Sequence, residues 1–375
     1  MIQDRRGIIL RFTGIMLVMT VNTFAFIAKD ISNRKMVISS KVHAKDRNEL
    51  SRRRKAFTHI ITSAAATDDD NDGSAVSPLD LTHTNAVGLY KQYAEYAAQQ
   101  LLGTGWLEND ISVPKDLSAN QASARGTKLE SIVRITTQAL IPKTSGGKSN
   151  TQSLIRYARI TLLETVPLNN DSVDEQTVSS DGIQVLNFVL LPRADTTLPV
   201  LGIDLVSLPG SKHLLLLDAQ PMVQPNPHED HWENWYNQHV VASGSKDDND
   251  EERTLKYAWG GDFPEAVQQY VSKYALWTRL QNLSEGDDDS GMMTTSSCVD
   301  AIQGDLFVAF QAHIDAYLEL LGNFAENHEA VVGENHQPSY LDYRRNNDPA
   351  KPMLNSLYGA EWTQSLLDNV LFPKD

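Results

Sequence analysis

Residues 182–220 read GIQVLNFVLLPRADTTLPVLGIDLVSLPGSKHLLLLDAQ, which is three apolar runs joined by short polar links. Links this short cannot hold the crossover helix that parallel strands need, so the runs must pair as antiparallel neighbours. Two further β-rich runs precede them. The five predicted strands cover about 129–141, 153–166, 182–192, 198–208 and 212–220. The sequence therefore predicts an antiparallel meander, and no GxGxxG or P-loop pattern favours a nucleotide-binding fold.

Helical periodicity lies on both sides of this predicted sheet. Apolar and aromatic residues recur at three- and four-residue spacing in about 82–102, 227–243, 263–271, 299–323 and 359–371. Helices before and after a single antiparallel sheet imply a three-layer α/β/α sandwich, with a central antiparallel sheet flanked by helices. We expect the folded part to be one domain, residues 78–375.

Cysteine usage limits the chemistry. Cys298 is the only cysteine among the 375 residues. The chain therefore cannot form an intrachain disulfide, a four-cysteine iron–sulfur site or a cysteine zinc cluster. Any redox reaction must take its electrons from outside or from a non-covalent cofactor.

The charge is unevenly distributed. Residues 1–55 contain 13 Lys and Arg but 4 Asp and Glu, which leaves 20 basic and 44 acidic residues and a net charge of −24 for the rest. Binding to nucleic acid needs a basic face, so this balance argues against a nucleic-acid partner.

The first 77 residues have the composition of a targeting leader. Arginines precede an apolar run at 12–28, and small residues lie near Ala25, as in a signal peptide; a single membrane anchor is the alternative. A basic, serine-rich stretch and an acidic linker follow. We therefore expect a signal peptide at 1–26, a transit peptide and acidic linker at 27–77, a plastid location, and no membrane segment in the mature form.

Three predicted strands contain a polar residue among hydrophobic ones: Asn187, Asp204 and Asp218. Burying a carboxylate costs several kcal/mol unless it is paired, hydrogen-bonded or protonated. A carboxyl that keeps its proton at neutral pH can act as a general acid. These residues are therefore candidates for a functional site, and structural hydrogen bonds to neighbouring loops are the alternative.

Seven segments carry a resemblance to a known family. They are RYARI at 156–160, VLNFVLLP at 185–192, LPVLGIDLVS at 198–207, LDAQP at 217–221, WGGD at 259–262, YALWTR at 274–279 and YRRNNDP at 343–349. In content and order they resemble the ferredoxin-dependent bilin reductases. The resemblance implies an antiparallel sheet flanked by helices, with a bilin between the sheet and the C-terminal helices. It also implies no bound cofactor, reduced ferredoxin as the external electron donor, and a preceding bilin reductase as a candidate supplier of the substrate.

The resemblance also assigns roles to residues. Asp204 and Asp348 fall on the family's proton-donating aspartates, and Asn187 falls where other members have histidine or aspartate. A turn is the alternative for Asp348, because the Asn-Asn-Asp-Pro sequence suits a turn. The remaining substrate-binding candidates are Asp218 and three arginines that suit propionate groups: Arg156, Arg159 and Arg279. For each arginine, a surface salt bridge is the alternative.

Within the family, Asn187 with Asp204 and the stretches 276–279 and 353–363 favour a member that reduces 15,16-dihydrobiliverdin to phycoerythrobilin. Sister reductases acting on biliverdin, a non-catalytic bilin carrier, and a zinc hydrolase using His228 and His231 remain alternatives. Because plant-type ferredoxin is acidic, we expect a local basic patch for docking. Its candidates are Lys143, Lys148, Lys212, Arg344, Arg345 and Lys351.

Overall fold

The apolar runs form one antiparallel sheet in the computed structural model, which describes residues 88–124, 131–143, 154–167, 182–209, 212–242, 255–281, 295–327 and 335–374. Its strands are β1 (Leu107–Asn109), β2 (Ala119–Ala124), β3 (Ser131–Pro142), β4 (Ile155–Pro167), β5 (Gln184–Pro192), β6 (Val200–Leu208), β7 (Lys212–Gln220) and β8 (Leu276–Gln281). From β3 to β8 each strand pairs with the next, and β1 and β2 both pair with β3. The predicted meander is confirmed.

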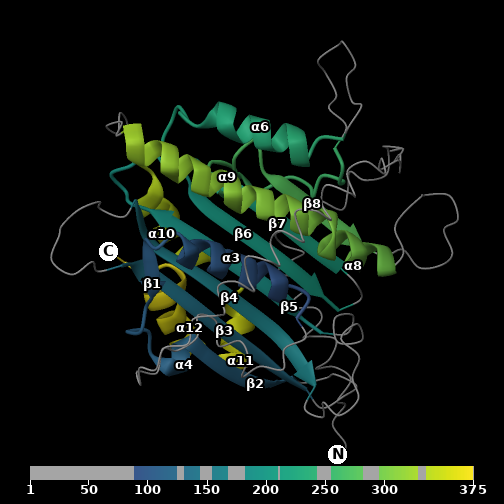
Figure 1. Ribbon diagram of the computed structural model, residues 1–375. Helices are drawn as coiled ribbons and strands as arrows, with labels where there is room; N and C mark the ends of the chain where they lie inside the picture. The colour runs from purple at the N-terminus through teal and green to yellow at the C-terminus, as the bar shows by residue number, and fades with distance from the viewer. Residues whose placement is uncertain are drawn as a thin grey trace, which may run out of the picture. The chain divides into compact units, whose positions relative to one another are not determined.

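One face of the sheet is covered by one helix that precedes the strands and three that follow β7 along the chain. These are α3 (Lys91–Gly103), α6 (Glu229–His239), α8 (Thr295–Gln303) and α9 (Asp305–Asn327). Figure 1 shows α3 and α9 lying over one face of the sheet, with α6 packed on α9. Leu186, Phe188 and Leu190 of β5 and Phe310 of α9 belong to the core on this side.

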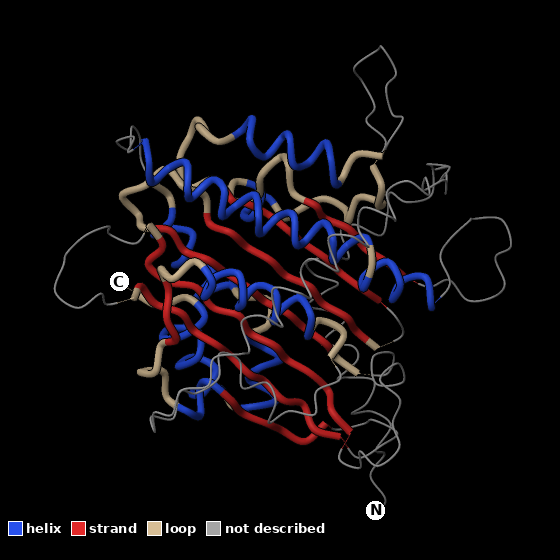
Figure 2. Tube along the Cα trace, in the orientation of Figure 1, coloured by secondary structure: helices blue, strands red, loops and turns tan. Residues whose placement is uncertain are grey.

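The opposite face is covered mainly by the C-terminal helices. They are α10 (Gln337–Asn347), α11 (Lys351–Tyr358), α12 (Ala360–Leu366) and the π-helical turn η3 (Leu367–Leu371), joined by the short α4 (Lys115–Ser118). Val189 and Leu191 of β5 join Leu367 and Phe372 in a second core cluster. Because β5 is buried on both faces, its sequence is almost continuously apolar. Figure 2 shows helices on both sides of the strands, so the predicted α/β/α sandwich is confirmed.

The region after β7 was predicted less well. The helix expected at 263–271 is only α7 (Glu265–Gln268), and β8 was not predicted as a strand. β8 is an edge strand whose hydrophobic residues are Leu276, Trp277 and Leu280, a spacing that also suits a helix. α10, α11 and the short strands β1 and β2 were also not predicted.

The predicted leader, residues 1–77, lies outside the described residues. All described residues belong to one compact unit of the chain. None of the described helices combines the length and the apolar character that crossing a bilayer requires.

Candidate functional site

Three neighbouring strands present polar side chains to the C-terminal helices. Asn187 of β5 lies directly opposite Asp204 of β6, and Thr161 of β4 lies directly opposite Asn187. Directly opposed side chains point to the same face of a sheet. The Asn187 amide nitrogen donates a hydrogen bond to Asp204 Oδ1. Two of the three strand residues that the sequence singled out are therefore in contact.

Helix α10 adds a second set of polar groups. Tyr340, Arg344 and Asp348 follow one another at four-residue spacing, so their side chains lie on one side of the helix. Asp348 is the C-cap residue with extended ψ, and Pro349 cannot continue the helix. Its Oδ1 accepts a hydrogen bond of 2.8 Å from the Ala350 backbone nitrogen. Asp348 is thus a turn residue and a site residue at once.

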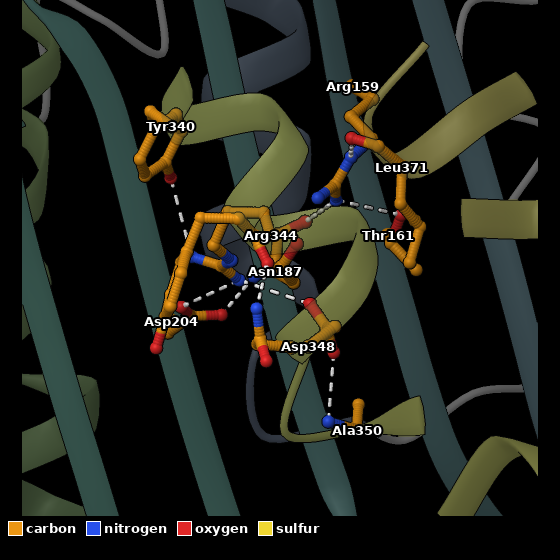
Figure 3. Close-up of polar contacts among 11 residues, drawn as sticks. Arg159, Thr161, Asn187, Asp204, Tyr340, Arg344, Asp348, Ala350 and Leu371 are labelled. Carbon is orange, nitrogen blue, oxygen red and sulfur yellow. Dashed lines mark hydrogen bonds and ion pairs between the residues drawn. The ribbon is translucent and has the colours of Figure 1, made fainter. Parts of the chain in front are cut away.

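Arg344 joins the two aspartates (Figure 3). Its Nη2 lies 3.3 Å from Asp348 Oδ2 and 3.9 Å from Asp204 Oδ2. Its Nη1 donates a hydrogen bond of 3.3 Å to the Tyr340 hydroxyl. The side chain of Asp204 is 33% exposed and that of Asp348 is 6% exposed, so of the two carboxyls Asp204 is the one open to solvent.

Arg344 is the positive charge that lies between Asp204 and Asp348. Burial lowers the pKa of its guanidinium, but Tyr340, Asp348 and Asp204 raise it by more, and the pKa ends above its ordinary value. The guanidinium is therefore charged at any working pH. Its charge stabilises negative charge on either carboxyl group in this partly buried place.

Arg159 is a second cation in the cluster and is fully buried. Its Nε donates a hydrogen bond of 2.7 Å to the Leu371 carbonyl, and its guanidinium carbon lies 5.1 Å from the centre of the Phe372 ring. Burial lowers its pKa to about 10. Arg159 fixes the C-terminal segment to β4, and the predicted contact with a propionate would require that segment to move.

Asp218 is also fully buried. It accepts hydrogen bonds from both the backbone nitrogen and the hydroxyl of Ser272, in the loop before β8. Burial raises the pKa of its carboxyl to about 7, although the bonds from Ser272 lower it. The expected proton-holding carboxyl is therefore present, but a direct contact between Asp218 and substrate would require its neighbours to move.

The other two predicted arginines lie outside the Asp204 cluster. Arg156 is half-buried near the start of β4, and its Nε donates a hydrogen bond of 3.1 Å to Gln337 Oε1 of α10. Arg279 is half-buried on β8, with its guanidinium carbon 5.9 Å from the Trp277 ring centre. Their roles as propionate ligands stay predictions.

Beside Asp204, the same face of the sheet carries apolar side chains that stay half-buried. We call Val206, Leu214, Leu216 and Trp277 the apolar floor. In the strand register Leu216 lies opposite Asp204, Trp277 opposite Leu216, and Leu214 opposite Val206. None of the four belongs to either core cluster. An accessible apolar surface next to a few convergent polar groups suits a flat, mostly apolar ligand.

Arg344 and Tyr340 were not predicted as site residues. The sequence assigned Arg344 to a docking patch, because the helix through residue 347 was not recognised. With that helix in place, the four-residue spacing from Tyr340 to Asp348 would have placed all three side chains together.

The described candidates for the predicted basic patch do not all lie together. Arg344 lies in the site, and Arg345 is buried and bonded to the Phe372 carbonyl. Lys212 begins β7 and Lys143 follows β3, which places them at opposite ends of the sheet. Lys148 lies outside the described residues.

The zinc alternative also finds no support in the described part of the chain, where no three His, Cys, Asp or Glu side chains gather as metal ligands. His231 Nε2 is 2.9 Å from the Ala316 carbonyl oxygen, and His228 Nε2 is 3.1 Å from the Thr197 hydroxyl. Both histidines are half-buried and join elements of the fold.

The arrangement can exchange protons with a ligand on the apolar floor. Asp204 stands at the edge of the floor, Asp348 faces it across the guanidinium of Arg344, and Asn187 can orient Asp204. Carboxyl groups at fixed positions next to an apolar surface are suited to general acid–base chemistry on a flat conjugated molecule.

Sequence comparison identifies the family. The profile of the ferredoxin-dependent bilin reductases matches residues 175–373, which include β5 to β8 and α10 of this site but not β4. The chain belongs to that family. It is an oxidoreductase that takes its electrons from ferredoxin and acts on a bilin.

Its relatives include phycoerythrobilin:ferredoxin oxidoreductases of cyanobacteria. The protein of Prochlorococcus marinus subsp. pastoris is 34% identical over 203 residues, 52% of this chain and 68% of that protein. The protein of Gloeobacter violaceus is 34% identical over 197 residues, 51% of this chain and 68% of that protein. Tomato phytochromobilin synthase in complex with biliverdin aligns with a TM-score of 0.48 and 18% identity, over 76% of this chain and 82% of that one.

Proposed function

We propose that this enzyme reduces 15,16-dihydrobiliverdin to phycoerythrobilin, with Asp204 and Asp348 as the proton donors and ferredoxin as the source of single electrons. The observation that carries the proposal is the pair of aspartates joined by Arg344 at the edge of the apolar floor. The substrate is argued from Asn187 beside Asp204 and from relatives with that name.

Reduction of one double bond in the A-ring diene system needs two electrons and two protons. An electron added to the bilin makes it more basic, and a carboxyl held nearby can then protonate a defined carbon. Each proton leaves a carboxylate behind. Arg344 stabilises that carboxylate, because it lies within 4 Å of both acids.

The two acids differ in how they regain a proton. Asp204 is 33% exposed at its side chain, so water can reload it. Asp348 is 6% exposed and touches Arg344 and the Ala350 backbone, so its proton supply depends on motion of the site or on Asp204. Geometry, rather than a bound redox group, then decides which carbon is protonated.

Product identification tests the proposal. The full chain is incubated with reduced ferredoxin and either 15,16-dihydrobiliverdin or biliverdin, and the products are separated by chromatography. Phycoerythrobilin from 15,16-dihydrobiliverdin, with biliverdin left unreduced, is the expected result. Turnover of biliverdin would instead assign the chain to a sister reductase, and tight binding without turnover would make it a carrier.

We also propose that residues 1–77 direct the protein to a plastid. The support is the basic, serine-rich composition after the apolar run at 12–28. A fluorescent protein fused behind residue 77 should enter plastids of an alga with secondary plastids, and a fusion that stays in the secretory pathway would reject the proposal.

A further inference from the structure

The side chain of Trp277 lies at the edge of the apolar floor that is farthest from the aspartates. Asn187, Asp204, Leu216 and Trp277 follow one another across β5, β6, β7 and β8 on one face. Three strand spacings make this row roughly 14 Å long. A bilin lying along the row with one ring at Asp204 extends towards Trp277, since β8 is the last strand on this side.

A short strap, residues 259–262, fixes the position of the Trp277 side chain. Trp259 forms an isolated antiparallel bridge with Thr278, and the Gly260 nitrogen donates a hydrogen bond of 3.0 Å to the Trp277 carbonyl. The Trp277 indole nitrogen donates in turn to the Gly261 carbonyl at 2.8 Å. Gly261 has φ of +102°, a backbone conformation that favours glycine. The strap and the indole therefore hold each other in place.

Gly260 lies directly against the indole. A Cβ atom added at residue 260 would overlap the ring of Trp277, so the strap can approach this closely only with glycine. The Phe263 ring centre lies 5.2 Å from that of Trp277. Gly260 and Phe263 thus both lie against the indole, yet Trp277 as a whole stays half-buried, on the face that carries Asp204.

We propose that Trp277 contacts the bilin and bounds its site at the β8 edge, and that Gly260 and Gly261 act as positioning residues for its indole. The inference rests on the proposed bilin reduction and adds the residue that limits how far the pigment extends from Asp204. A rigid aromatic side chain suits this task, because it offers a large apolar contact and loses little conformational entropy when the ligand binds.

The test uses four variants of the full chain: Gly260→Ala, Trp277→Leu, both together, and Gly322→Ala. Gly322 is the matched control, because a Cβ there meets nothing within 4 Å on α9. Each protein is titrated with 15,16-dihydrobiliverdin, and the Kd and the absorption spectrum of the bound pigment are recorded. Gly260→Ala and Trp277→Leu should each weaken binding about 5- to 10-fold and shift the bound spectrum.

The double variant separates positioning from general damage. With Trp277→Leu present, Gly260→Ala should add almost nothing, because the ring it displaces is gone. Gly322→Ala should match the wild type. Binding and spectra of both single variants equal to those of the wild type would overturn the inference.

Two controls distinguish the outcomes. If the wild type itself neither binds nor reduces the bilin, the proposed function fails, and that result is distinct from a failure of Trp277. If circular dichroism shows that Gly260→Ala does not fold, Trp277→Leu decides alone: wild-type binding by that variant refutes the contact.

Discussion

The buried carboxyl of Asp218 should make the protein less stable as pH rises. Its pKa is about 7 in the folded protein, against an ordinary value of 3.8. Between these values the folded protein holds a proton that the unfolded chain has lost, so the free energy of unfolding falls as pH rises from about 4 to about 7. At 1.36 kcal/mol per pH unit, the whole effect is about 4 kcal/mol, of which about 3 kcal/mol lies between about pH 5 and about pH 8.

Replacing Asp218 by asparagine removes the titration. An amide oxygen can still accept a hydrogen bond from Ser272, but the amide nitrogen introduces buried donors, which costs about 1–3 kcal/mol at every pH. Asp218→Asn should therefore have lower stability than the wild type under acid conditions and equal or higher stability under alkaline conditions.

Urea unfolding at about pH 5 and about pH 8 measures this difference, and Asp300→Asn, on the exposed side of α8, is the matched control. Other buried groups also titrate: burial lowers the pKa of His213 to about 4, and it raises the pKa of Glu164. The difference between wild type and variant cancels these contributions. If that difference is the same at both pH values, Asp218 does not titrate in this range and the reasoning is refuted.

Three further changes test the site and the fold. Asp348→Asn should keep bilin binding and lower turnover by about 100-fold or more, measured with reduced ferredoxin, because an amide cannot donate the carboxyl proton; wild-type turnover would contradict its role. Arg344→Leu leaves the carboxyl groups of Asp204 and Asp348 without their cation. Breaking a fully buried pair lowers the free energy of unfolding by about 3–5 kcal/mol, and the loss is smaller here because Asp204 is partly exposed. An unchanged midpoint of urea unfolding would contradict the pairing. Burial against Trp235 lowers the pKa of His313 on α9 to about 3, so between about pH 6.5 and about pH 3 the unfolded chain holds a proton on this histidine that the folded protein does not, and the free energy of unfolding falls as pH falls through that range. His313→Phe should make the Tm fall less steeply as pH is lowered below about 6.5. A Tm that falls as steeply in the variant as in the wild type would show that this histidine is not the cause of the acid dependence.

The difference between the two predicted catalytic residues shows where sequence reasoning works. Asp204 was identified because a carboxyl in an apolar strand breaks a period-two pattern, which is a local signal. Asp348 carries no such signal, since its Asn-Asn-Asp-Pro context describes a turn equally well, and only the family resemblance placed it in the site. The structure shows that it caps α10 and meets Arg344.

Sequence alone determined the meander and the two helical layers, and it singled out Asn187 and Asp204, because alternation and link length are local properties that survive into the fold. It did not determine what lies across from the strands. Arg344 reaches Asp204 only because α10 packs on that face, and Arg159 and Asp218 are sealed because later segments fold over them. Contacts between segments distant along the chain follow from packing the whole core at once, so only the tertiary structure decided which polar groups face the site and which hold it in place.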